Sequence, residues 1–212
     1  IFKNLQNLIL NNLRNILITI GILFICFISF QSYNYFSIQK LKKTSIKFFN
    51  SIEGSSMIVE NLNEIRKTDN IFSTLSILKL IEINNEQKNY SISNELFKEL
   101  ILSNELDNLY ISSIAAHASY ALINASYLEN TKNYLSDISI YISNISDEIE
   151  SYASIKKELE YLFTLTELDL KNIDYKNNSK VLELYNEIIN SATISSSVKE
   201  RVKKIHEFQT YK

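Results

Sequence analysis

Apolar residues recur at spacings of three and four from Met57 onward, and no stretch alternates apolar and polar positions long enough for a strand. Such spacing places apolar side chains on one helical face. It predicts helices over 38–52, 57–67, 70–84, 91–103, 107–126, 131–142, 148–171, 177–192 and 195–210. Because the chain has no Pro and two Gly, its turns are assigned to Asn- and Asp-rich segments, whose side chains bond the local backbone.

The predicted helices of the body come in pairs: 71–84 with 91–103, 108–126 with 132–142, and 149–171 with 177–190. The pairs begin roughly 37 to 41 residues apart, an interval typical of helical repeat proteins. In an α-solenoid each helical hairpin buries its apolar face only by stacking on its neighbours. The pattern therefore predicts a solenoid with a groove, the usual surface for binding a peptide or a protein.

The N-terminal part contains an apolar run, residues 16–30, in which only Thr19, Gly21 and Ser29 are weakly polar. Extended through Tyr33, Tyr35 and Phe36, a helix of this length approaches the roughly 30 Å hydrocarbon thickness of a bilayer. The two tyrosines would then lie at an interface, with flanking cations reaching outward. We therefore expect a single membrane-spanning helix over residues 15–36.

Two other interpretations of the apolar run are a cleaved signal peptide and a buried core helix. A signal peptide needs small residues at its cleavage site, whereas "SFQSYNYFSIQ" supplies bulky aromatic side chains. A core helix would show a polar face, and residues 16–30 show none. The membrane anchor is the better interpretation of this run.

Charge is distributed unevenly although the net charge is only −2. The first 52 residues contain six basic residues and no acidic one, which leaves 16 basic and 24 acidic residues in the remainder. An acidic body argues against a nucleic-acid-binding surface. The flanks of the apolar run bear on orientation, because basic residues favour the cytoplasmic side. The C-terminal flank carries Lys40, Lys42, Lys43 and Lys47 against Lys3 and Arg14 on the other flank, which places the body in the cytoplasm.

Residues suited to chemistry are sparse. His117 and His206 lie in different predicted helices, and the single Cys26 lies in the apolar run, so neither a metal site nor a histidine-based catalytic site is expected. The carboxylate clusters "KKELE" and "SDEIE" are interpreted as solvated helix faces. Two glycines cannot build a phosphate-binding loop. We expect no enzyme activity, no cofactor and no small-molecule substrate.

The segment "KNYSISNELFKELI" resembles the second helix of a tetratricopeptide repeat. Tyr90 supplies the turn, Ser93 takes the small position and Phe97 is the aromatic residue. The register returns in weaker form with Tyr134 and Tyr141, and again with Tyr175 and Tyr185. The helix "LDNLYISSIAAHASYALINA" supplies the small residues of a first helix, namely Ala115, Ala116, Ala118 and Ala121.

Together with the anchor, residues 15–192 resemble the bacterial YfgM-like family, most specifically through "ELDNLYISSIAAHASYAL". The chain departs from the family in having Ser or Ile at many Ala positions and no repeat-ending Pro. The resemblance implies a body in the periplasm, association with the Sec translocon and with membrane-anchored chaperones, and no catalysis. The periplasmic side is opposite to the one that the lysine distribution favours.

The expected fold is all-α, with an N-terminal membrane helix, a tetratricopeptide-like α-solenoid of about three hairpins, and a C-terminal helix. The expected divisions are 1–37 for the flank and membrane helix, 38–69 for a helical connector, and 70–212 for the repeat domain. Candidate partner-binding residues are Tyr110, Tyr120, Tyr127 and Tyr161, because aromatic side chains anchor protein interfaces. Candidate repeat-packing residues are Tyr90, Ser93, Phe97, Ala115, Ala118, Tyr134 and Tyr185. The expected function is a bacterial inner-membrane scaffold that binds other proteins, and the alternative is a structural subunit of a larger membrane complex.

Overall fold

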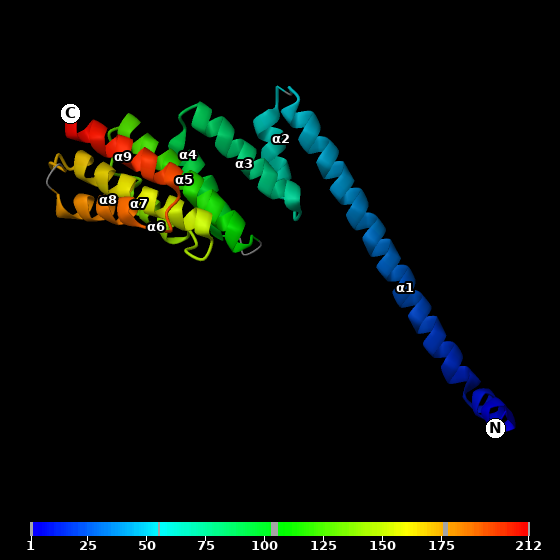
Figure 1. Cartoon of the computed structure of the whole chain (residues 1–212). Helices are drawn as coiled ribbons and strands as arrows, with labels where there is room; N and C mark the ends of the chain where they lie inside the picture. The colour runs from blue at the N-terminus through cyan, green and yellow to red at the C-terminus, as the bar shows by residue number, and fades with distance from the viewer. Residues whose placement is uncertain (1, 55, 103–105, 176–177, 212) are drawn as a thin grey trace. The chain divides into compact units, whose positions relative to one another are not determined.

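The computed structural model describes residues 2–54, 56–102, 106–175 and 178–211, with side chains described from Leu17 to Gln209 within these ranges. These residues form nine α-helices and no β-strand (Figure 1). The predicted all-α class is therefore confirmed. The helices are α1 Phe2–Ile52, α2 Ile58–Ile65, α3 Ile71–Glu86, α4 Tyr90–Leu102, α5 Asn108–Leu128, α6 Leu135–Ser143, α7 Glu150–Leu170, α8 Ser179–Asn190 and α9 Ser196–Tyr211.

The chain divides into two compact units, Ile1–Ser76 (unit 1) and Ile77–Lys212 (unit 2). The division falls inside α3, whereas the sequence analysis placed it before residue 70. A second difference concerns α1, which runs unbroken to Ile52 and so joins the predicted membrane helix and the predicted connector helix 38–52. Residues 31–50 contain no Gly or Pro that would end a helix, so the helix continues past the apolar run.

Unit 1 is held together by a small apolar core between α1, α2 and the start of α3. Leu62 and Ile65 of α2 are buried, and the ring of Phe48 on α1 lies 5.6 Å from the ring of Phe72 on α3. A hydrogen bond of 2.6 Å from the Ser73 hydroxyl to the Arg66 carbonyl fixes the turn before α3. This core secures the C-terminal half of α1.

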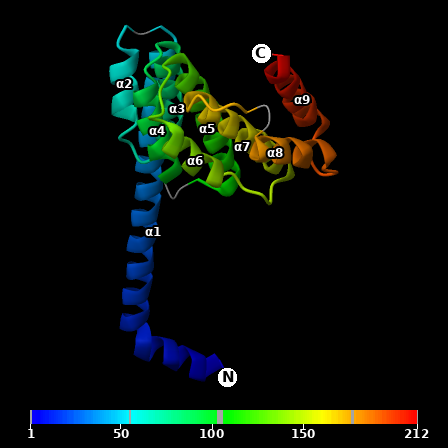
Figure 2. The ribbon, with the colours of Figure 1, turned by 90° about the vertical axis from the view of Figure 1, so that its left-hand side faces the viewer.

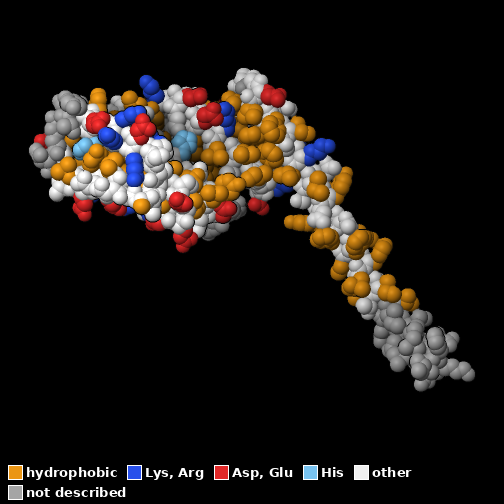
Figure 3. Space-filling view, viewed as in Figure 1, with side chains coloured by type: hydrophobic (Ala, Val, Ile, Leu, Met, Phe, Trp, Pro, Cys, Tyr) orange, Lys and Arg blue, Asp and Glu red, His pale blue; other side chains and the backbone are white. Residues whose placement is uncertain are grey.

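The N-terminal half of α1 has the opposite character. Among the described residues, one helical stretch, Leu17–Ile52, is long and apolar enough to cross a membrane. None of the residues in its most apolar part is buried within the protein. Figure 3 shows hydrophobic side chains projecting along the described part of α1. An apolar surface of this extent requires a covering medium.

Unit 2 is built around α5, which packs against α4, α6 and α7. Helix α7, the first helix of the following pair, is placed in the same way, because it packs against α6, α8 and α9. Figures 1 and 2 show α5 and α7 side by side within unit 2. Close approach to α5 is possible because its buried positions are small, and Ala115, Ala118 and Ala125 are all fully buried.

The same turn ends the first helix of each pair. Lys88 has a positive φ of 59°, its N–H donates to Asn85 and the following N–H donates to Asn84, which is a Schellman motif. The motif returns at intervals of 42 residues, with left-handed residues Lys88, Asn130 and Asn172 and the same two hydrogen bonds each time. A recurring turn at a fixed interval indicates an internal structural repeat.

A serine hydrogen bond repeats at the same interval. The hydroxyl of Ser112 on α5 accepts a bond of 2.9 Å from the backbone N–H of Ser146, just before α7. On α7, Ser154 accepts a bond of 3.2 Å from the N–H of Ser195, just before α9. Ser112 and Ser154 are both buried and lie 42 residues apart. The first bond therefore joins the start of α5 to the segment before α7, and the second joins the start of α7 to the segment before α9.

The helices that begin at Asn- or Asp-rich turns are capped by those side chains. Asp107 accepts bonds from two backbone N–H groups at the start of α5, and Asn178 does the same for α8. Asn70 accepts a bond of 3.0 Å from the N–H of Phe72 at the start of α3. These caps explain how a chain without Pro begins its helices at defined residues.

Candidate interaction surface

A depression lies over α7 and between α6 and α8, and we call it the α7 groove. Its volume is about 410 Å³, with Phe163 and Leu184 among its apolar walls. It is lined by Ser139, Ile142, Ser143, Lys156, Glu160, Phe163, Thr164, Lys180 and Leu184. The groove arises because α6 and α8 both pack on α7, which forms its floor.

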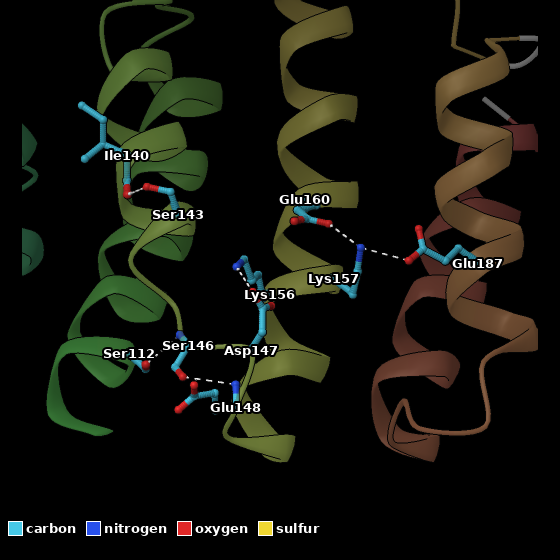
Figure 4. Close-up of polar contacts among 10 residues, drawn as sticks. All are labelled: Ser112, Ile140, Ser143, Ser146, Asp147, Glu148, Lys156, Lys157, Glu160 and Glu187. Carbon is cyan, nitrogen blue, oxygen red and sulfur yellow. Dashed lines mark hydrogen bonds and ion pairs between the residues drawn. The ribbon is translucent and has the colours of Figure 1, made fainter. Parts of the chain in front are cut away.

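Ion pairs fix the charged side chains around the α7 groove (Figure 4). Lys157 bridges α7 and α8, with its Nζ 3.2 Å from Glu160 and 2.9 Å from Glu187. The hydrogen bond to Glu187 is the main reason that the pKa of Lys157 is raised. Lys156 pairs with Asp147 at 2.7 Å. The charged residues that line the groove itself are Lys156, Lys180 and Glu160, and its other lining residues are apolar or bear a hydroxyl group.

Two further depressions involve α6 or the segment that follows it. One of about 500 Å³ shares Ser143 and Lys156 with it and extends along the segment 144–148. The other, of about 280 Å³, lies between α4 and α6 and is mostly apolar, with Leu102 and Ile140 on its rim. Figure 4 shows Ile140 and Ser143 on α6, where the Ser143 hydroxyl donates a 2.7 Å bond to the Ile140 carbonyl. Helix α6 therefore has a depression on each side.

A buried polar network joins α4 to α6 beside these depressions. The Tyr141 hydroxyl donates a 2.6 Å bond to the side-chain oxygen of Asn94, whose amide nitrogen donates a 2.6 Å bond to Asp137. Lys98 completes the network 3.1 Å from Asp137, and this hydrogen bond raises the pKa of Lys98. The network fixes the register of α4 against α6 because each buried polar group has a partner.

Three of the four predicted partner-binding tyrosines lie along one side of α5. Tyr110 and Tyr127 are 59% and 42% exposed, and Tyr120 is half-buried between them. At about 100° per residue, Tyr120 and Tyr127 lie about 20° apart around the helix, and Tyr110 lies roughly 80–100° from them. None of them lines the α7 groove or the two further depressions described above. We call this surface the α5 tyrosine face.

Tyr161 is the exception, because its side chain is fully buried. Its hydroxyl lies 3.0 Å from Nδ1 of His206 on α9. It belongs to a core cluster with Leu165, Val181 and Ile188. The prediction of an exposed anchor at this position is therefore wrong, because the Tyr161 ring and hydroxyl make their contacts within the protein.

The predicted packing residues lie in the interior. Phe97, Ser93, Ala115 and Ala118 have no exposed surface. Tyr90 and Tyr134 are at most 8% exposed. Tyr185 is half-buried and stacks on the His206 ring at 3.9 Å. Buried or half-buried positions of this kind are expected for residues that pack one helix against another.

Sequence reasoning missed a buried carboxylate in the segment "KKELE". Glu158 was interpreted as part of a solvated face, yet it is 2% exposed. Its two oxygens accept bonds of 2.7 and 2.5 Å from Nε and a terminal nitrogen of Arg201 on α9. Such a bidentate pair is stronger than a single charged hydrogen bond. The spacing of the two residues, 43 positions apart, gives no signal of their contact.

Tyr120 joins this ion pair to the α5 tyrosine face. Burial raises the pKa of its hydroxyl, and the neighbouring Glu158 carboxylate raises it further. The pKa of Arg201 is also raised, chiefly by its hydrogen bonds to Glu158. The cluster therefore keeps a neutral tyrosine, a carboxylate and a guanidinium together across α5, α7 and α9. It ties three helices together.

The histidines are separated within unit 2. His117 on α5 lies with its ring 5.4 Å from the Phe97 ring, whereas His206 on α9 lies against Tyr161 and Tyr185. No group of three or more His, Cys, Asp or Glu side chains suited to a metal ion occurs among the described residues.

The burial of His206 is expected to make the stability of the fold depend on pH. Burial lowers the pKa of its imidazole below the usual 6.5. The unfolded chain therefore binds a proton more readily than the folded chain below about pH 6.5, and stability falls as the pH falls through this window. We expect the free energy of unfolding in urea to decrease between pH 7.5 and 5.5, and to decrease less in His206→Gln. A Lys203→Gln control should keep the full decrease, and an equal decrease in both variants would contradict this role of His206.

No family model matches the chain. No curated protein and no solved structure matches it either. The relation to the YfgM-like family therefore remains a prediction from the sequence.

Proposed function

We propose that the chain is a non-enzymatic scaffold, anchored in a bacterial inner membrane by α1, whose unit 2 binds other proteins at the membrane. The observation that carries this proposal is the α7 groove, whose lining combines three large apolar side chains with hydroxyl groups, two lysines and one glutamate. Clefts of this composition suit a segment of another protein that brings apolar side chains and at least one carboxylate.

The repeated construction of unit 2 supports the proposal. The Schellman turns and the buried serine bonds both return at 42 residues, and α5, α7 and α9 pack in sequence. Repeat proteins of stacked hairpins have extended surfaces formed by several units together. A tetratricopeptide-like organisation of this unit is therefore part of the proposal.

The membrane anchor contributes in its own right. Confinement of unit 2 to a membrane raises its effective concentration towards other membrane proteins without any new contact. By resemblance to the YfgM-like family, the proposed partners are the Sec translocon and membrane-anchored chaperones, and the proposed side is the periplasm. The exposed apolar surface of residues 17–36 is the structural support for insertion.

Photo-crosslinking tests the groove directly. A photoreactive amino acid at Ser139, which lines the groove on α6, is expected to form adducts with a translocon or chaperone subunit in intact membranes. Ser136 is a matched control, since it is exposed on the same helix and does not line the groove. Adducts of equal yield from both positions, or none from Ser139, would contradict the proposed surface.

A structural subunit of a larger complex is the second candidate. It is favoured by large exposed apolar side chains on separate helices, such as Leu102 on α4, 77% exposed, and Phe208 on α9, 68% exposed. This alternative predicts that unit 2 aggregates when released from its complex. A fragment of residues 53–212 that stays soluble and monomeric in analytical ultracentrifugation would argue against it.

A further inference from the structure

The α7 groove has a counterpart on the other side of α6, which we call the α4/α6 depression. Its walls include Ile101 and Leu102 of α4 and Ile140 and Asn144 of α6. Ile101 lines this depression, and Ser143, 42 residues later, lines the α7 groove. The groove and the depression therefore occupy related places in the 42-residue repeat.

Helix α6 separates the groove from the depression. It contributes Ser139, Ile142 and Ser143 to the groove. It contributes Asp137, Ile140, Tyr141 and Asn144 to the depression. At about 100° per residue the two sets fall on opposite sides of the helix, and their closest members, Ile140 and Ser143, are about 60° apart. Both residues are drawn on α6 in Figure 4. A chain that crosses α6 between these two side chains can therefore reach both the groove and the depression.

The surface of α6 at this crossing carries hydrogen-bond acceptors. The Ser143 hydroxyl donates a bond of 2.7 Å to the Ile140 carbonyl, and the amide nitrogen of Asn144 donates one of 2.9 Å to the same carbonyl. Both side chains are exposed, so their oxygen atoms can still accept bonds from a partner. An extended polypeptide has free backbone N–H groups to donate, whereas those inside an α-helix are already used. The crossing therefore favours an extended segment.

The charges that line the groove favour a carboxylate on that segment. Lys156 pairs with Asp147 at 2.7 Å. Glu160 pairs with Lys157 at 3.2 Å. Lys180 also lines the groove, but its side chain makes no ion pair with a carboxylate of the described residues. An acidic side chain of the partner would supply the missing charge.

The α4/α6 depression instead suits an apolar side chain. Its two charged groups, Lys98 and Asp137, lie 3.1 Å apart and balance each other. Leu102 and Ile140 are 77% and 53% exposed, so a partner that covers them would remove apolar surface from water. The groove offers a second apolar contact through Phe163.

We infer that unit 2 binds a partner segment in an extended conformation laid across α6. One apolar side chain lies in the α4/α6 depression, a second lies in the α7 groove, and a carboxylate beside the second pairs with Lys180. The groove and the depression are about 10 Å apart, the diameter of a helix with its side chains. In a polyproline II segment, residues i and i+3 lie on one side, about 9 Å apart. The expected motif is therefore two apolar residues three positions apart, with an acidic residue next to one of them.

This inference rests on the proposed function and assigns a motif to the bound partner. The test uses the full chain in nanodiscs and a fluorescent nine-residue peptide, in which two alanines separate two leucines and an aspartate follows or precedes the pair. An isolated peptide of this length does not form a stable helix in water. Fluorescence anisotropy is expected to show saturable binding for one of the two orders. Asparagine in place of the aspartate should weaken that binding about tenfold, the size of one charge-assisted hydrogen bond.

Three variants separate the contacts. Lys180→Gln should weaken binding of the aspartate peptide about tenfold and leave binding of the asparagine peptide unchanged. Ile140→Ser should weaken binding of both peptides about tenfold, because it removes apolar surface from the depression. Lys132→Gln replaces an exposed lysine outside the groove and the depression and should match the unsubstituted chain. Circular dichroism should show unchanged helical content in all three.

Several outcomes would overturn the inference. Absence of binding, or binding that Lys180→Gln and Ile140→Ser leave unchanged, would remove the extended segment from this surface. Tighter binding of a helical peptide with its leucines seven positions apart would show that the occupant is a helix. Adducts from Ser139 in membranes without peptide binding would retain the proposed scaffold function and remove the motif alone, whereas absence of both would remove the function as well.

Discussion

Phe97→Ala is expected to lower the free energy of unfolding by about 3–5 kcal/mol, the loss typical of a phenylalanine deleted from a core. The Phe97 side chain has no exposed surface, and its ring lies 6.3 Å from the Tyr141 ring and 5.4 Å from the His117 ring. Removing it therefore leaves a cavity where α4, α5 and α6 meet. Urea unfolding of the full chain in mild detergent, followed by circular dichroism, measures the change.

Phe208→Ala is the matched control for this substitution. Phe208 lies on α9 and is 68% exposed, so its loss should change stability by less than about 0.5 kcal/mol. If Phe97→Ala left stability unchanged and instead abolished partner binding, Phe97 would be a binding residue and not a packing residue.

Arg201→Met is expected to destabilise the fold by about 2–3 kcal/mol, because it leaves the Glu158 carboxylate without its partner. This loss is smaller than the loss expected for a fully buried ion pair. The Arg201 side chain is 50% exposed, so water can replace part of its interaction with Glu158. The double variant Glu158→Gln/Arg201→Met should be more stable than Arg201→Met alone, since it removes the uncompensated charge. The same urea unfolding experiment measures both.

Lys204→Met provides the comparison for a surface ion pair. Lys204 pairs with Glu200 at 2.8 Å, but both side chains are more than two-thirds exposed, so we expect a much smaller loss of stability than from Arg201→Met. A loss from Arg201→Met no larger than that from Lys204→Met would contradict a stabilising role for the buried pair.

The positions of the helices in the body followed well from the sequence. The predicted 107–126 and 148–171 correspond to α5 Asn108–Leu128 and α7 Glu150–Leu170. Periodicity is a local property, and the caps at Asp107 and Asn178 are local as well. The continuation of α1 to Ile52 was missed because a change from apolar to basic residues marks a change of environment and not the end of a helix.

The surface was less predictable than the helices. Tyr110 and Tyr161 look alike in sequence, and the packing of α8 and α9 around Tyr161 decides that one is exposed and the other buried. The pairing of Glu158 with Arg201 is likewise set by tertiary packing between α7 and α9. The α7 groove depends on the separation of α6 and α8, which no local pattern encodes.

The 42-residue interval is difficult to detect from the residue types alone. The residues at the left-handed turn positions are Lys88, Asn130 and Asn172, which share a backbone conformation but only partly a side-chain type. The chemical similarity that marks a repeat is therefore weak at these positions, while the hydrogen-bond pattern is the same at all three. The spacing of the predicted helices indicated a repeat of roughly 37 to 41 residues, and the backbone geometry gives the interval between the turns as 42 residues.

The proposed arrangement, a membrane-anchored body on the periplasmic side, is tested most directly by the location of the C-terminus. A tandem reporter fused after Lys212 would combine alkaline phosphatase, active only in the periplasm, with a green fluorescent protein that fluoresces only in the cytoplasm. If the body lies in the periplasm, high phosphatase activity and no fluorescence are expected in a bacterial host. Bright fluorescence without phosphatase activity would contradict it, and would show that the lysines after the apolar run decide the orientation.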